Sequence, residues 1–178
     1  DPIFKLSPYE IRHNLKEVPW IQDAQVYRQL PSTIYVKIVE RVPIAIWQHQ
    51  RNHYLVDGQG VIITNENLPQ FTKLPIVVGG DAPVHVPKIL KILEKFPEVR
   101  DIVTALVRIG ERRWDIQLNH KVTLKLPELK VEEALSKLSG LIHQKKLDLE
   151  EIKTIDLRIP DKTIVNLSPR GEIRLKGK

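Results

Sequence analysis

The stretch that decides the fold is Trp114-Asp115-Ile116-Gln117-Leu118-Asn119-His120-Lys121-Val122-Thr123-Leu124-Lys125-Leu126, which alternates apolar and polar residues on both sides of a short break. Pairing Leu118 with Val122 leaves a three-residue loop and places every apolar residue of the two segments on one face. A two-residue loop would pair Leu118 with Lys121 and mix the faces. The stretch therefore predicts an antiparallel hairpin whose buried face consists of Trp114, Ile116, Leu118, Val122, Leu124 and Leu126.

A second hairpin is expected near the end of the chain. Pairing Ile159 with Thr163 puts Leu157 opposite Val165 and leaves a consistent apolar face. The same register turns Ile164 outward, onto a face that is otherwise polar. From the residues alone, Ile164 fits equally well an ordinary exposed side chain and a contact for a partner.

The region between residues 43 and 150 carries the patterns of both helices and strands. Pro87–Phe96 and Val131–His143 place apolar residues at helical spacing, so each predicts a helix packed on a sheet, and Pro97 is expected to end the first. Asp57-Gly58-Gln59-Gly60 predicts a tight turn. Short strands are expected at Ile44–Gln48, Tyr54–Val56, Val61–Thr64 and Leu74–Val78.

The first 42 residues form a separate unit. Ser7-Pro8-Tyr9-Glu10 is a capping box, so a short helix should begin there. Strands are expected at Gln22–Arg28 and Ile34–Glu40, with Val26 opposite Val36. About 35 residues of helix, strand and strand are too few to bury a core. A further element is therefore expected upstream, and Glu40-Arg41-Val42-Pro43 is the expected hinge to the rest of the chain.

Composition narrows the class of protein. The chain has 178 residues, no cysteine and a formal net charge of +6, with 28 basic residues spread among 22 acidic ones. The lack of cysteine excludes disulfides, thiolate metal sites and a cysteine nucleophile. No apolar run approaches the roughly 20 residues of a membrane span. After Ser168 the chain is basic and contains glycine, so residues 169–178 are predicted to be a flexible tail.

Neither a catalytic nor a metal site is expected. His49 and His53 are the only histidines close in sequence, and no acidic residue beside them completes a zinc set. Asp57–Gly60 precedes a strand rather than a helix, so it is not a phosphate loop. Nucleic-acid binding is not expected either, because the candidate Arg112-Arg113-Trp114 has its tryptophan on the buried face. The sequence thus predicts a protein without enzyme activity or cofactor.

Several short motifs follow one another along the chain. They are Val18-Pro19-Trp20-Ile21, Val26-Tyr27-Arg28-Gln29-Leu30-Pro31, Glu40-Arg41-Val42-Pro43-Ile44-Ala45-Ile46-Trp47, Leu55-Val56-Asp57-Gly58-Gln59-Gly60, Arg113-Trp114-Asp115-Ile116-Gln117-Leu118 and Ile155-Asp156-Leu157-Arg158. In this order they resemble the FtsQ/DivIB family of bacterial cell division proteins. The resemblance covers nearly the whole chain. It implies an α+β protein: a POTRA domain at residues 1–42, incomplete at its N-terminus, followed by a mostly antiparallel β domain with two helices at residues 43–168.

The same resemblance implies a location and partners. It places this region on the periplasmic side of the bacterial inner membrane, anchored by one helix upstream of Asp1. It implies a non-catalytic scaffold of the division machinery that binds FtsB, together with FtsL, and other division proteins through the POTRA domain. The alternative is an envelope assembly or secretion protein, a class that also uses POTRA domains.

The partner site implied by the resemblance lies at the end of the β domain. A final strand can leave one side unpaired, and an incoming strand can satisfy it by β-augmentation. Ile164 would provide an apolar anchor and Arg158 a charge. The expected partner-binding residues are Arg158, Ile159, Lys162, Thr163, Ile164, Val165, Asn166 and Leu167.

Overall fold

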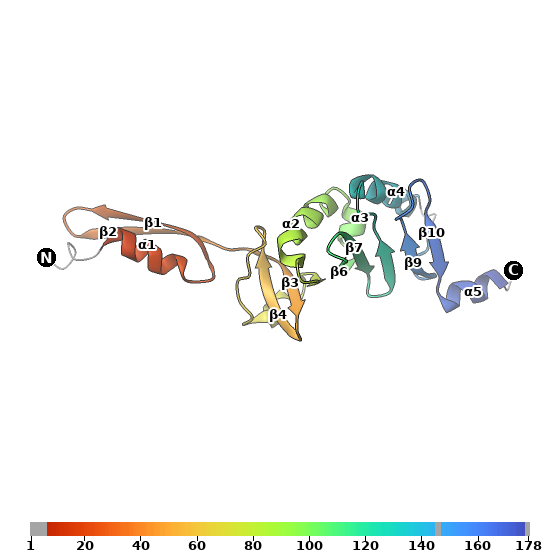
Figure 1. The fold of residues 1–178 in the computed structure, drawn as a ribbon, viewed down its shortest axis with the longest axis horizontal. Helices are drawn as coiled ribbons and strands as arrows, with labels where there is room; N and C mark the ends of the chain where they lie inside the picture. Colours follow the sequence, from red (N-terminus) through yellow and green to blue (C-terminus); the bar gives the residue numbers. More distant parts are fainter. Residues whose placement is uncertain (1–6, 145–146, 177–178) are drawn as a thin grey trace.

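The computed structural model describes residues 7–144 and 147–176 as two sheets joined by a short connection (Figure 1). The N-terminal unit consists of α1 (Pro8–Lys16), β1 (Ile21–Gln29) and β2 (Thr33–Glu40). Ser7 caps α1 as predicted, because its side chain accepts a hydrogen bond from the Glu10 amide at 3.4 Å. β1 and β2 pair antiparallel with Val26 opposite Val36, which confirms the predicted register.

Only part of the small sheet is covered. α1 packs against β1, where Ala24 is fully buried. On β2, Val36 and Ile38 are 44% and 45% exposed. The described residues therefore bury little of the apolar surface of β2, as the small size of the unit suggests.

The larger domain is built on one mixed sheet of eight strands in the order β10-β9-β8-β7-β6-β5-β3-β4. Four neighbouring pairs are antiparallel and three are parallel, namely β3 with β5, β5 with β6, and β8 with β9. The strands are β3 (Pro43–His49), β4 (Asn52–Asp57), β5 (Ile76–Val78), β6 (Val103–Ile109), β7 (Arg113–Leu118), β8 (Val122–Lys125), β9 (Ile152–Asp156) and β10 (Ile164–Leu167).

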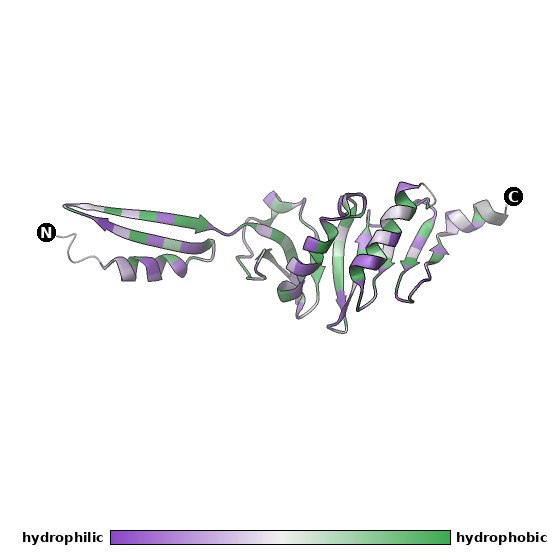
Figure 2. Ribbon diagram, turned by 90° about the horizontal axis from the view of Figure 1, so that it is seen from above, coloured by the Kyte–Doolittle hydropathy of each residue, from purple (hydrophilic) through white to green (hydrophobic). Residues whose placement is uncertain are grey.

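Helices cover one side of this sheet (Figures 1 and 2). They are α2 (Ala82–Leu93), α3 (Pro97–Arg100) and α4 (Val131–His143), and a 3-10 helix, η2 (Leu68–Phe71), lies in the loop before β5. α4 has the predicted bounds, and its buried residues are Ala134, Leu135 and Leu138. They belong to the same apolar cluster as Leu106, Ile116 and Leu124 of the sheet. The core is the layer between helices and sheet.

The hairpin of β7 and β8 has the predicted register. Leu118 pairs with Val122 and Ile116 with Leu124, and the amide of Leu126 donates to the carbonyl of Trp114 at 3.0 Å. All six residues of the predicted face are at most 5% exposed. The prediction of this buried face is confirmed.

β6 and α3 were not expected from the sequence. β6 lies between β5 and β7, and its central residue Leu106 is fully buried. Five of the seven residues in Val103–Ile109 are apolar, and Leu106 interrupts the alternation of apolar and polar positions that would indicate a strand. Pro97 begins α3, whereas the helix that it was expected to end, α2, already ends at Leu93.

Two predicted elements differ from the structure. The helix expected at Pro87–Phe96 is α2, which begins at Ala82, ends at Leu93 and contains Pro87 in its interior. The missing amide of Pro87 removes one hydrogen bond of the helix. Val61–Thr64 is not a strand but forms a single bridge, between Val56 and Ile62. Otherwise the segment Val61–Thr64 is joined to the β4 backbone by isolated hydrogen bonds.

The expected flexible tail at 169–178 is instead helical at α5 (Pro169–Lys176), while residues 177–178 lie outside the described part of the chain. The amide of Gly171 donates to the Ser168 hydroxyl at 3.4 Å, and the amide of Glu172 to the Ser168 carbonyl at 3.0 Å. Serine followed by proline is a favourable helix start. Gly171 also packs closely on Glu151: a Cβ at this position would lie 2.5 Å from the Glu151 carbonyl oxygen.

In the part of the chain that the structure describes, no helix combines the length and apolar character needed to cross a membrane.

Replacing Leu124 with alanine tests the buried face of the central hairpin. Leu124 is fully buried, so Leu124→Ala should lower the free energy of unfolding by about 2–5 kcal/mol through lost contacts and a residual cavity. Thr123 faces the other side, and Thr123→Ala should lower it by only about 1 kcal/mol or less. Urea denaturation followed by circular dichroism measures both. Equal losses would contradict the assignment of faces.

Candidate partner-binding edge

β10 lies at the end of the eight-stranded sheet. Among the described strands it pairs with β9 alone, antiparallel. An edge strand has one row of amide and carbonyl groups that its own sheet does not use. β10 is therefore a possible acceptor for a further strand.

The other edge of the sheet is less open. At β4, the amides of Leu55 and Asp57 donate to the carbonyls of Thr64 and Val61, at 2.7 and 3.0 Å. The segment that was expected to be a strand thus covers part of this edge. Of the two edges, β10 is the one without such cover in the residues that the structure describes.

The register of β9 and β10 differs from the prediction by two residues. Val165 pairs with Ile155 rather than Leu157, and Ile164 pairs with Asp156. The predicted pair Ile159–Thr163 does not form, and the strand expected at Lys162–Leu167 begins only at Ile164.

The cause is a contact that lies outside the hairpin. The amide of Leu157 donates to the carbonyl of Lys125 at 2.9 Å, so Leu157 continues the pairing with β8 and is 5% exposed. The connection to β10 consequently runs over residues 157–163 instead of three residues. A shift of two residues preserves the faces of a strand. Ile164 and Asn166 are exposed, whereas Val165 and Leu167 pack on the core.

Arg158, at the start of this connection, is paired within the chain. Its guanidinium donates to both carboxylate oxygens of Asp156, with distances of 2.6–3.0 Å. The hydrogen bond from Arg158 lowers the pKa of Asp156 below its usual value, and the same hydrogen bond raises the pKa of Arg158. Arg158 is therefore not an isolated charge, but a guanidinium held in one orientation at the rim of the edge.

The rest of the connection forms one wall of a small hollow. The hollow has a volume of about 120 Å³, and the start of α4 with the loop before it forms the opposite wall. Ile159 is 47% exposed and Leu129 75% exposed, so apolar surface is available there. Lys137 of α4 closes one side through an ion pair with Asp161 at 3.0 Å. The residues lining it are Pro127, Leu129, Lys130, Glu133, Ala134, Lys137 and 157–163.

The structure thus brings the eight residues expected from the sequence into two adjoining groups. Arg158, Ile159, Lys162 and Thr163 line the hollow, and Ile164–Leu167 form β10. The contribution of Leu129 and α4 was not predicted, because only the tertiary packing places them beside the connection. The described residues contain no group of three or more histidine, aspartate or glutamate side chains that could hold a metal ion.

Comparison with known proteins identifies one family over both parts of the chain. The family described as "Cell division protein FtsQ/DivIB, C-terminal" matches residues 45–158, and the domain described as "POTRA domain, FtsQ-type" matches residues 1–41. Both matches follow the division between the small and the large sheet.

Similar proteins carry the same description. The cell division protein FtsQ of Rickettsia felis is 42% identical over 161 residues, which cover 90% of this chain and 60% of that protein. FtsQ of Rhizobium meliloti is 36% identical over 162 residues, 91% of this chain and 52% of that protein. The chain thus spans 52–60% of the length of these two relatives.

A solved structure is also similar: the major extracytoplasmic domain of the cell division protein DivIB from Geobacillus stearothermophilus, at 13% sequence identity and a TM-score of 0.42. The match covers 62% of this chain and 99% of that chain.

Substitutions in β10 can separate its two faces. Val165 packs on the core, so Val165→Asp should lower the free energy of unfolding by about 1–3 kcal/mol, because it places a polar group in apolar surroundings. Ile164 faces outward, and Ile164→Asp should change it by about 0.5 kcal/mol or less. Thermal melts of the two variants measure the difference. A larger loss for Ile164→Asp would show that the faces are reversed.

Proposed function

This chain belongs to the FtsQ/DivIB family of cell division proteins, and on that premise we propose that it is a non-catalytic scaffold whose strand β10 accepts a strand of FtsB, in complex with FtsL. The observation that carries the proposal is the open edge of β10. Strand addition there would satisfy the unpaired backbone groups and extend the sheet.

The side chains around β10 favour a partner segment of mixed character. Ile164, 41% exposed, offers an apolar contact on the strand itself. The hollow beside Ile159 offers a second apolar contact, where a side chain that follows the added strand could insert. Arg158, fixed by Asp156, and the exposed Lys162 favour an acidic residue in the partner.

Location and further partners are part of the same proposal. We place the chain on the periplasmic side of the bacterial inner membrane, held by a single helix upstream of Asp1, and assign contacts with other division proteins to the POTRA domain. The support is membership of the family. The alternative of an envelope assembly or secretion protein is less well supported, because the matching POTRA description is of the FtsQ type.

Ile164→Glu tests the strand addition. It removes an apolar contact and places a charge in the interface, so the affinity for the periplasmic segment of FtsB should fall about tenfold or more. The melting temperature should remain close to that of the unmodified protein, because Ile164 does not face the core. Isothermal titration calorimetry measures the affinity.

A matched control is available at the other edge of the sheet. Ile62 is 44% exposed and lies beside β4, so Ile62→Glu introduces the same charge without touching β10. Its affinity for FtsB should equal that of the unmodified protein. An unchanged affinity in Ile164→Glu, or an equal loss in both variants, would contradict docking at β10.

Asp156→Asn tests whether Asp156 positions Arg158. Asparagine keeps the shape of the side chain but loses the charge that holds the guanidinium, so the affinity for FtsB should fall about three- to tenfold. Arg158→Gln should have a similar effect, and the double variant should lose no more than the stronger single one. Additive losses would show that the two residues act independently.

A further inference from the structure

The two sheets are joined by only two residues, because β2 ends at Glu40 and β3 begins at Pro43. Arg41, the first of them, is bound on both sides. Its amide donates to the carbonyl of Trp20 in the N-terminal unit, at 2.8 Å. Its guanidinium lies 2.6 Å from a carboxylate oxygen of Asp57, at the end of β4 in the larger domain. One residue thus contacts both sheets at the point expected to be a hinge.

The Asp57 carboxylate is held firmly. Its side chain is 4% exposed, and one oxygen accepts hydrogen bonds from the amides of Gln59 and Val61, at 2.9 and 2.8 Å. The other oxygen receives Arg41. Burial alone would raise the pKa of Asp57, but the hydrogen bonds from Val61, Arg41 and Gln59 outweigh it and lower the pKa. The group is therefore a buried anion at neutral pH.

The negative charge of Asp57 is balanced by Arg41, which lies in the connection between the two sheets. Arg41 is the only cation that forms an ion pair with Asp57 in the described residues, and its own side chain is 16% exposed. An ion pair with both members largely buried is strongly destabilised when one member is removed, because the other charge stays buried without a partner. The two sheets cannot separate at this point without that penalty.

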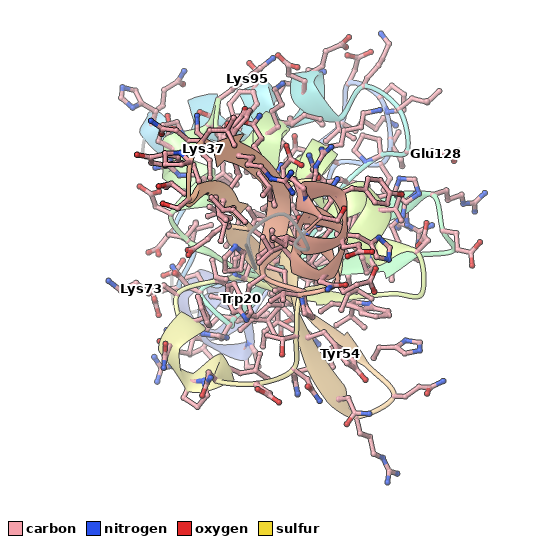
Figure 3. All side chains as sticks on the ribbon, turned by 90° about the vertical axis from the view of Figure 1, so that its left-hand side faces the viewer. Trp20, Lys37, Tyr54, Lys73, Lys95 and Glu128 are labelled. Atoms are coloured by element: carbon pink, nitrogen blue, oxygen red, sulfur yellow. The ribbon has the colours of Figure 1, made fainter. Side chains whose placement is uncertain are left out.

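A contact between two aromatic rings also joins the two units. Trp20, just before β1, stacks on Phe71, the last residue of η2, with ring centroids 6.1 Å apart and the rings inclined at 29°. Figure 3, which views the molecule from its N-terminal end, shows the small unit in front of the larger domain with Trp20 labelled. The junction therefore has a polar and an aromatic contact in addition to the covalent connection.

We propose that Arg41 and Asp57 form a latch that holds the small sheet in one orientation relative to the large sheet, so that the two domains move as one body. Domains joined by a short linker with little shared interface usually move relative to one another. The latch removes this freedom. It would fix the position of the β10 edge relative to the N-terminal domain, whichever partner each of them binds.

Distance measurements between spin labels test the latch. The chain has no cysteine, so cysteines introduced at Lys37 of β2 and Lys91 of α2, both exposed, are the only labelling sites. Double electron–electron resonance should give a narrow distance distribution. With Arg41→Ala added, the distribution should broaden by about twofold, as expected for independent domains.

Controls separate the latch from general destabilisation. Arg100→Ala removes an arginine–aspartate pair of 2.7 Å inside the larger domain and should leave the distribution narrow. Asp57→Asn keeps an oxygen for the amides of Gln59 and Val61 but loses the charge, so it should broaden the distribution with the β domain still folded. Circular dichroism of each labelled variant checks folding. A narrow distribution in folded Arg41→Ala or Asp57→Asn would overturn the proposal.

Discussion

Burial of one face of β7 and β8 is the constraint on which the rest of the structure depends. Six apolar side chains at alternating positions must leave water together, and only one register allows this. The helices α2 and α4 then lie on that face of the sheet. The opposite face is left to polar residues, where Asp115, Lys125 and Asp156 follow one another across β7, β8 and β9. Ile164 ends this row on β10, so the same constraint that buries the core also determines which side chain the edge presents.

The elements predictable from the sequence are those specified by neighbouring residues. The register of β1 with β2, the hairpin of β7 and β8, and the bounds of α4 all follow from short loops and clear periodicity. β6 was missed because the apolar Leu106 stands where alternation would place a polar residue, which obscures the period of two. α5 was missed although Ser168-Pro169 is a favourable helix start, because its packing depends on a close contact of Gly171 with Glu151 that the sequence does not show.

The candidate site shows the same division. The outward orientation of Ile164 could be derived from alternation alone, and the error of two residues in the register of β10 did not change it. The open edge itself was expected only from the family resemblance. The hollow beside β10 could not be predicted from the sequence, because its walls come from the loop before α4 and from the connection after β9. Arg41 and Asp57 were visible only as members of two separate motifs, at Glu40–Trp47 and Leu55–Gly60. Their ion pair across the junction follows only from the tertiary structure.

An open edge strand is a hazard for a secreted or cytosolic protein alike, because another copy can pair with it. β10 limits this hazard by its length, since four residues provide few backbone hydrogen bonds to any added strand. Backbone hydrogen bonds alone then bind an added strand weakly, so side chains must distinguish the partner strand from other strands. Ile164 on the strand, and Ile159 with Leu129 at the hollow, supply apolar contacts that only a segment of matching sequence can use. A short edge with nearby apolar contacts therefore suits a chosen partner better than a second copy of itself.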